Sequence, residues 1–175
     1  MIEARILAEV KEAAGRHDDW RALGLFKDGG GSTGVHIAVM VDPFLSYILE
    51  GKKTIESRFS KHLIAPYKRI SEQDVVLLKA GPLVASFRAS SVECVELNET
   101  ERKRLIDGYS EAICADEAFW EARENKNYAT LIGISDVQAL TPVKVSKNDR
   151  RGWLVLRDGA EGDGTAHGDE QLSFM

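Results

Sequence analysis

Apolar and polar residues at the start of the chain recur with the period of a helix. Within residues 2–14, charged residues fill most of the positions between four regularly spaced apolar ones, which are Ile2, Ile6, Val10 and Ala13. The pattern predicts an amphipathic helix that stops at Gly15. A short apolar segment follows at 20–26. The glycine-rich run 28–34 lacks the lysine and the preceding strand of a phosphate-binding loop, so we predict a flexible connector there.

From residue 35 onward the pattern is typical of strands with helices between them. Residues 35–41 are rich in Val, Ile and Ala and predict a strand. Asp42 and Pro43 predict the start of a short helix, because Asp is a favoured N-cap and Pro fits the first helical position. Gly51 stands where a left-handed residue would end that helix.

The rest of the chain continues the same alternation. Strands are predicted at 54–59, 74–79, 83–97, 128–140 and 153–156. Asn98 with Glu101 resembles a capping box and predicts a helix to about residues 107–108. One or two further helical pieces are predicted within 109–125, the second one capped by Asp116.

These elements together indicate an α+β fold. Five or six strands of this length suit a small, closed or partly open β-barrel flanked by helices. We divide the chain into a helical extension with its glycine-rich linker at 1–34, a main domain at 35–157, and an acidic tail at 158–175. The tail has little to bury and is expected to be disordered.

Composition adds few constraints. The 175 residues suggest one domain, and 43% apolar and 29% charged residues are ordinary for a globular protein. No stretch approaches the roughly 18 continuous apolar residues of a membrane helix. The first residues lack the pattern of a secretory signal, and Cys94 and Cys114 stand alone. A cytoplasmic protein without membrane association is therefore expected.

Charge is distributed unevenly along the chain. The formal net charge is −5, but the tail holds five acidic residues and no Lys or Arg, so the body before it is formally neutral. Two segments of that body, 52–69 and 144–151, are basic. If the fold brings them together they form a positive patch suited to nucleic acid; otherwise they are two solvated loops.

The run 51–58 places a lysine, a carboxylate and an arginine within six residues, with the spacing Gly-x-Lys-x-x-Glu-x-Arg. Side chains alternate along a strand, so Glu56 and Arg58 share one face. Lys53 joins them only if the turn between the helix and the strand, or a bulge, redirects it. The group is then either a solvated ion pair or a clamp for an anion and polar groups.

Lys53 has two alternative roles in such a cleft. A neighbouring arginine and burial would lower its pKa, whereas Glu56 would raise it. With a lowered pKa, Lys53 would act as a base or activate a nucleophile. A lysine that stays charged would bind phosphate.

Gly51, Lys53, Glu56 and Arg58 match the signature of the activating signal cointegrator homology (ASCH) domains, which belong to the PUA-like superfamily, and the resemblance covers about residues 35–156. It implies a small barrel, a cleft between barrel and helix, and RNA or a modified nucleoside as ligand. Some members of the family are ribonucleases. Small bacterial relatives deacetylate 4-acetylcytidine with a lysine and a threonine of this motif and a glutamate from elsewhere.

Lys53 matches the catalytic lysine of those relatives, but this chain has the carboxylate of Glu56 where they have the threonine. Aromatic rings bind single-stranded RNA by stacking, and Trp153 directly follows the run Arg150-Arg151-Gly152; its alternative role is that of a core residue. Lys53 and Glu56 are the candidate catalytic residues. The candidate ligand-binding residues are Lys53, Glu56, Arg58, Tyr128, Lys147, Arg150, Arg151 and Trp153.

Three classes of function stay open. The first is an RNA-binding or nucleoside-binding module, the second a hydrolase acting on RNA or an acylated nucleoside, and the third an interaction domain with a relic cleft. No cofactor is expected, except a divalent metal if the chain is a ribonuclease. The scattered histidines have no metal-ligand spacing.

Overall fold

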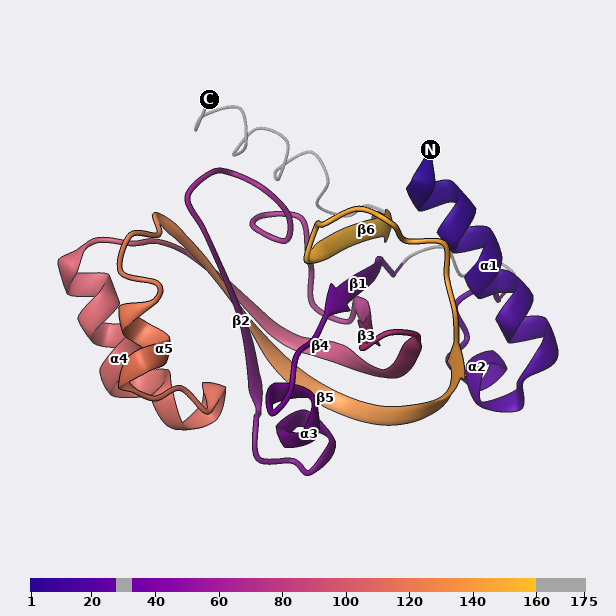
Figure 1. Ribbon diagram of the computed structural model, residues 1–175, viewed down its shortest axis with the longest axis horizontal. Helices are drawn as coiled ribbons and strands as arrows, with labels where there is room; N and C mark the ends of the chain where they lie inside the picture. The colour runs from indigo at the N-terminus through magenta and orange to yellow at the C-terminus, as the bar shows by residue number, and fades with distance from the viewer. Residues whose placement is uncertain (28–32, 160–175) are drawn as a thin grey trace.

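A computed structural model describes residues 1–27 and 33–159 of the chain. Within these residues the chain forms a curled sheet with helices at both ends of the molecule (Figure 1). The strands are β1 (Val35–Val39), β2 (Ile55–Ser60), β3 (Val75–Lys79), β4 (Leu83–Glu96), β5 (Tyr128–Val143) and β6 (Trp153–Arg157). The helices are α1 (Ile2–Arg16), α2 (Asp18–Ala22), α3 (Phe44–Leu49), α4 (Glu99–Ile113) and α5 (Glu117–Glu121).

The strands form one sheet in the order β2-β5-β4-β3-β1-β6. All neighbours are antiparallel except β1 and β3, which are parallel. The sheet curls into a half-barrel, because the long strands β4 and β5 shift register at three places, and such bulges increase bend and twist. At one of them Gly133 approaches the hydroxyls of Ser90 and Ser91 so closely that a Cβ would collide with both.

The predicted α+β class and barrel-like sheet are confirmed. Several boundaries differ. β1 ends at Val39 rather than at 41, β5 continues to Val143 rather than ending at 140, and α3 has Pro43 rather than Asp42 as its N-cap. The largest difference is that α4 continues through Gly108 to Ile113, where the sequence pattern predicted an end at 107–108. Its true stop is Cys114, which takes the left-handed conformation with φ of 64°. Asn98 and Asp116 cap α4 and α5 as predicted, accepting from the amides of Glu101 and Phe119.

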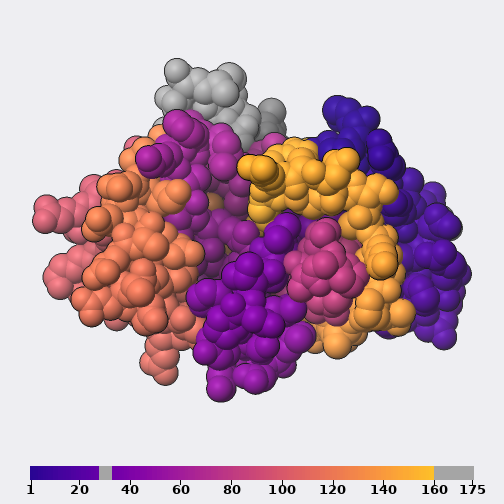
Figure 2. Space-filling view, viewed as in Figure 1, coloured from indigo at the N-terminus to yellow at the C-terminus, as the bar shows by residue number. Residues whose placement is uncertain are grey.

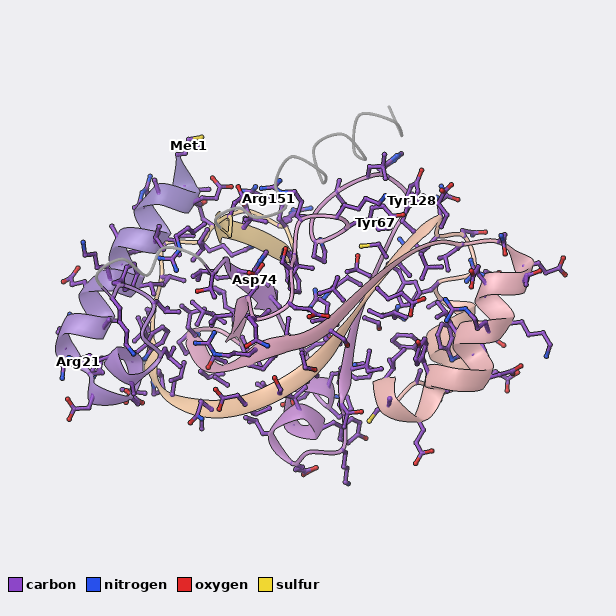
Figure 3. The ribbon with its side chains drawn as sticks, turned by 180° about the vertical axis from the view of Figure 1, so that it is seen from behind. Met1, Arg21, Tyr67, Asp74, Tyr128 and Arg151 are labelled. Atoms are coloured by element: carbon purple, nitrogen blue, oxygen red, sulfur yellow. The ribbon has the colours of Figure 1, made fainter. Side chains whose placement is uncertain are left out.

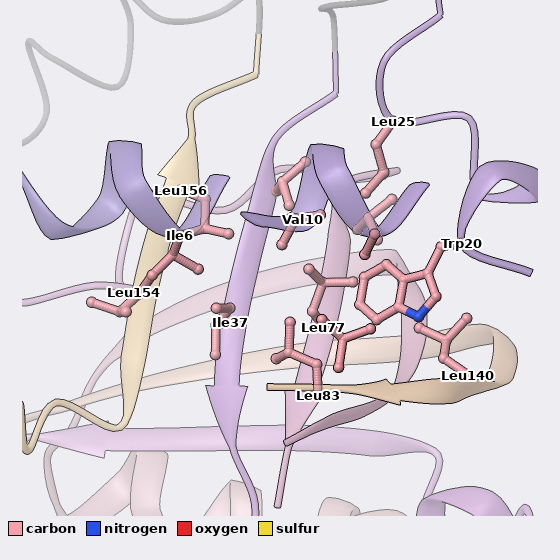
Figure 4. Close-up of a cluster of buried hydrophobic side chains, with 14 residues drawn as sticks. Ile6, Val10, Trp20, Leu25, Ile37, Leu77, Leu83, Leu140, Leu154 and Leu156 are labelled. Carbon is pink, nitrogen blue, oxygen red and sulfur yellow. The ribbon is translucent and has the colours of Figure 1, made fainter. Parts of the chain in front are cut away.

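The N-terminal helices cover one end of the sheet and share its core (Figure 4). Ile6, Val10 and Trp20 are fully buried against Ile37 of β1 and Leu77 of β3. Burial of this apolar stripe explains why α1 forms. The extension therefore packs on the main domain through an apolar face. The connector at 28–32 and the tail from 160 onward lie outside the described residues.

Two further apolar clusters fill the rest of the molecule. One lies between α3 and the middle of the sheet, around Ile48, Phe87 and Ile132. The other lies under α4 and α5, around Leu105, Phe119 and Leu131. The second cluster holds α4 and α5 beside β2, the strand that carries Glu56 and Arg58. Among the described residues, no helix is long and apolar enough to cross a membrane.

Candidate functional site

The turn between α3 and β2 directs Lys53 toward the interior. Gly51 takes a φ of 81°, a left-handed conformation that favours glycine. The amides of Lys52 and Lys53 both donate to the carbonyl of Tyr47, at 2.9 and 3.0 Å. The amide of Thr54 then donates to the carbonyl of Ala112 at 2.9 Å. This turn, rather than a bulge in β2, brings Lys53 to the same side as Glu56.

Lys53, Glu56 and Arg58 meet in one buried cluster. The Lys53 Nζ lies 3.3 Å from Glu56 Oε1 and donates to the carbonyl of Ile113 at 2.9 Å. Arg58 contacts the other oxygen, Glu56 Oε2, through Nε at 2.8 Å and Nη2 at 2.7 Å. Glu56 thus holds one cation on each oxygen. The convergence that the strand period predicted for Glu56 and Arg58 is present, with Lys53 added by the turn.

Arg58 also connects β2 to the far side of the sheet. Its Nη2 donates to the carbonyl of Val39 at 3.0 Å, and its Nη1 to the carbonyl of Gly152 at 3.3 Å. Val39 ends β1, and Gly152 precedes β6. The guanidinium therefore joins one edge strand, β2, to the backbone beside the other edge strand, β6.

Burial and charge act on this cluster in opposite directions. The side chains of Lys53 and Glu56 are only 2% and 5% exposed. Burial lowers the pKa of Lys53 below its ordinary value, although Glu56 opposes that shift. Burial disfavours the charged form of Glu56 too, but the attraction of Arg58 and then Lys53 outweighs it and holds the pKa of Glu56 below its ordinary value. Glu56 is therefore a carboxylate at neutral pH.

A cavity of about 400 Å³, here called the main pocket, opens beside this cluster. The surface is hollowed there between the orange segment that carries α5 and the violet segment that carries β1 and α3 (Figure 2). The main pocket is lined by Val39, Met40, Val41, Phe44, Lys53, Glu56, Ser57, Arg58, Phe59, Phe119, Ala122, Arg123 and Lys126. Four cations and one carboxylate face it, together with three aromatic rings.

Arg123 and Lys126 are site residues that the sequence reasoning missed. The Arg123 guanidinium lies 3.6 Å from the centre of the Phe119 ring and donates to the carbonyl of Phe119 at 3.0 Å. Burial lowers the pKa of Arg123, which stays charged at neutral pH. The one sequence signal was the spacing of Phe119 and Arg123, four residues apart on a predicted helix.

Trp153 lies under the motif rather than on an open surface. It is 5% exposed, and its ring faces the Arg58 guanidinium at 5.4 Å. Its indole Nε1 donates to Nδ1 of the fully buried His36 at 3.0 Å. An indole nitrogen only donates, so His36 is neutral and carries its proton on Nε2, which donates to Asp74 Oδ2 at 2.9 Å. Trp153 is thus a core residue that also contacts Arg58.

Tyr128 lies away from the main pocket. It pairs with Ser60 at the end of β2, and its ring packs 5.0 Å from that of Tyr67 (Figure 3). The two rings tilt by 52° and leave Tyr128 partly buried.

The basic loop at 147–151 is largely neutralised by its own surroundings. Lys147 and Arg151 both contact the carboxylate of Asp149, at 2.9 and 2.6 Å. Arg151 also reaches Glu3 of α1 at 2.8 Å and lies toward that helix (Figure 3). Arg150 is exposed. None of these three basic side chains lines the main pocket. Among the described residues, no group of three or more His, Cys, Asp or Glu side chains is placed to hold a metal ion.

No protein-family model and no curated protein sequence matches the chain. Its structure, however, is similar to that of an ASCH protein from Zymomonas mobilis, with a TM-score of 0.56 and 14% identity over 79% of this chain and 94% of that one. Two single-substitution variants of the same protein match with the same TM-score and identity, over 79–80% of this chain and 95–96% of theirs. The chain therefore has the fold of an ASCH domain, as the motif at 51–58 predicted.

Proposed function

We propose that the chain binds RNA or a modified nucleoside in the main pocket. The observation that carries the proposal is the combination of aromatic walls with four cations around a single carboxylate in a cavity of about 400 Å³. Small-molecule pockets typically measure about 300–1,000 Å³. Single-stranded nucleic acid is recognised by stacking of bases on aromatic or guanidinium planes and by cations at the phosphates.

The pocket residues divide these tasks by position. The ring of Phe44 offers a flat surface for a base. The ring of Phe119, together with the Arg123 guanidinium that lies over it, offers a second flat surface. Lys126 and Arg123 on the α5 side provide charge for a phosphate. Glu56 already accepts from Lys53 and Arg58 on its two oxygens, so it orients these cations rather than reading a base.

A binding titration with nucleoside monophosphates and short single-stranded RNA tests the proposal. The wild-type protein is expected to bind with a salt-dependent affinity, because phosphate contacts release counterions. In Lys126→Ala, affinity for RNA should fall about 10-fold if that cation bonds a phosphate. The slope of log affinity against log salt should also become shallower by about 0.7.

Lys11→Ala is the matched control, because Lys11 is exposed on α1, at the opposite end of the molecule from α5 (Figure 1). Equal losses in Lys126→Ala and Lys11→Ala would show that the main pocket is not the binding site. An absence of binding to every nucleotide and RNA tested would overturn the proposal itself.

A second candidate is a hydrolase acting on RNA or on an acylated nucleoside. The observation that favours it is Lys53, a buried amine beside the main pocket whose pKa is lowered by burial. A neutral Lys53 could take a proton from water or from a substrate hydroxyl. The bacterial deacetylases that share this motif have a threonine hydroxyl at the position of Glu56. A carboxylate at this position removes the nucleophile that those relatives use.

Product formation from RNA and from acetylated cytidine, with and without divalent metal, separates the two candidates. A hydrolase should lose turnover in Lys53→Met, which keeps the length of the side chain and removes its charge, and keep it in Lys11→Ala. Circular dichroism on both variants checks that they fold. Binding without turnover by the wild-type protein under all of these conditions would leave the binding function and exclude hydrolysis of those substrates.

A further inference from the structure

A second, smaller cavity of about 160 Å³ adjoins the main pocket; we call it the side pocket. It is lined by Arg58, Phe59, Ser60, Ile64, Ala65, Pro66, Thr130, Gly152 and Trp153. Arg58 and Phe59 line both cavities. The two pockets therefore meet at Arg58, the residue that connects β2 to the far side of the sheet.

The order of side chains along β2 explains this arrangement. Glu56, Arg58 and Ser60 alternate onto one face of the strand. Glu56 lines the main pocket, Ser60 lines the side pocket, and Arg58 lies between them. Thr130 of β5 pairs with Arg58 across the strands and extends the same face. The pockets thus follow one another along one surface, in the direction of the strand.

The side pocket differs in chemistry from the main one. Of the described residues that line it, Arg58 alone is charged, while Ile64, Pro66 and the ring of Trp153 provide apolar surface. Ser60 and Thr130 add hydroxyl groups. Such a lining fits a flat, uncharged ring with polar edges better than a phosphate. Its volume is below the range of about 300–1,000 Å³ that is typical of separate ligand sites. It therefore suits one additional ring of a ligand that is already bound in the main pocket.

Arg58 retains a donor for a group that lies between the two pockets. Its Nε and Nη2 are held by Glu56 and by the carbonyl of Val39. Nη1 makes one long hydrogen bond, of 3.3 Å to the carbonyl of Gly152. A guanidinium Nη1 carries two N–H groups, and among the described residues the second one has no partner. The side chain is 22% exposed, so this donor can meet an anion at the surface.

We propose that the two pockets are one site for two consecutive nucleotides of single-stranded RNA. One base lies in the main pocket and the next in the side pocket, and the phosphate that joins them accepts from Arg58 Nη1. The inference rests on the proposed function and narrows it, because a free nucleoside would use only half of this site. The ligand class is then an RNA segment of at least two nucleotides.

The experiment compares a nucleoside monophosphate with dinucleotides of the same base in a binding titration. The wild-type protein should bind the dinucleotide about 10-fold more tightly, the gain expected for one extra stacked base. A dinucleotide with an uncharged methylphosphonate linkage should lose part of that gain, because the linkage no longer offers an anion to Arg58 Nη1. Equal affinities for the monophosphate and the dinucleotide overturn the two-nucleotide site and leave the main-pocket proposal standing. A full gain with the uncharged linkage overturns the role of Arg58.

Ile64→Ala tests the side pocket directly. Ile64 is 60% exposed, so its truncation should leave the fold intact. The variant should keep the affinity of the wild-type protein for the monophosphate and lose most of the dinucleotide gain. Leu49→Ala is the matched control, because Leu49 is 46% exposed on α3 and lines neither pocket. A dinucleotide gain that survives in Ile64→Ala overturns the inference; failure of every ligand to bind overturns the proposed function as well.

Discussion

Glu56 is a buried carboxylate whose two oxygens each contact a different cation. Lys53 and Arg58 keep it charged, and it in turn keeps two cations beside the main pocket. Because Lys53 and Glu56 are almost fully buried and Arg58 is only 22% exposed, the charges of the three groups depend on one another for compensation. Removing the carboxylate would leave two buried cations without their partner.

Glu56→Gln is therefore expected to lower the free energy of unfolding by about 3–5 kcal/mol, the usual cost of breaking a buried ion pair. Urea denaturation at pH 7 measures this. Glu50→Gln is the control, since within the described part of the chain the Glu50 carboxylate forms only an exposed pair with Lys52, at 3.7 Å; the substitution should change stability by about 0–1 kcal/mol. Similar midpoints for the two variants would show that the cluster around Glu56 is solvated.

At the scale of elements, helices at opposite ends of the sheet have different tasks. α5 presents Phe119 to the main pocket and the residues just after it present Arg123, and the third apolar cluster holds α5 there. α1 and α2 cover the other end. Trp20 is fully buried in that cover, and its Nε1 donates to the carbonyl of Thr141 in β5 at 2.8 Å. α1 and α2 thus share a core with the sheet rather than touching it through surface contacts alone.

Trp20→Ala should lower the free energy of unfolding of the whole domain by about 3–5 kcal/mol, because it leaves a cavity in a shared core. Chemical denaturation followed by circular dichroism and by fluorescence of the remaining tryptophans checks this. Lys11→Ala, exposed on the same cover, should be near neutral. If Trp20→Ala changes stability no more than this control, the extension is an independent appendage.

At the scale of the whole molecule, a buried network links β1 and β6 to the turn that precedes β3. Asp74 accepts from His36 on β1 and from the amides of Gly34 and Ser71, at 2.9, 2.8 and 3.0 Å, and His36 accepts from Trp153 on β6. Burial disfavours charge on Asp74, but the hydrogen bonds from His36 and Ser71 outweigh it and hold the pKa of Asp74 below its ordinary value.

This network predicts how global stability depends on pH. A carboxyl group whose pKa is lower in the folded than in the unfolded protein stabilises the fold above its ordinary pKa of 3.8, and the stabilisation is lost as pH falls through the folded value. Asp74→Asn should thus cost about 1–3 kcal/mol at pH 7 and weaken the loss of stability below about pH 4. Unfolding midpoints measured from pH 7 to pH 2 test this; parallel curves for the variant and the wild-type protein would contradict it.

Local sequence patterns were sufficient to predict most helices and strands and the shared face of Glu56 and Arg58. The N-caps at Asn98 and Asp116, the left-handed stop at Gly51 and the shared face of Glu56 and Arg58 all depend on residues a few positions apart. Periodicity also predicted an apolar face on residues 2–14 without saying what covers it. The end of α4 was missed because Gly108 is tolerated inside a helix that packs against β2.

By itself, the sequence determined the fold class, the order of strands and helices, and the shared face of Glu56 and Arg58, because short-range sterics and side-chain period decide these. The turn after α3, which is held by the carbonyls of Tyr47 and Ala112, decided that Lys53 joins them. Only the tertiary structure decided which distant residues complete the site. Arg123 approaches β2 through packing of α5, and Gly152 meets Arg58 across 94 positions of sequence. The same packing placed Arg151 beside Glu3 of α1 and buried Trp153 against His36, because such contacts depend on how the sheet curls rather than on any local pattern.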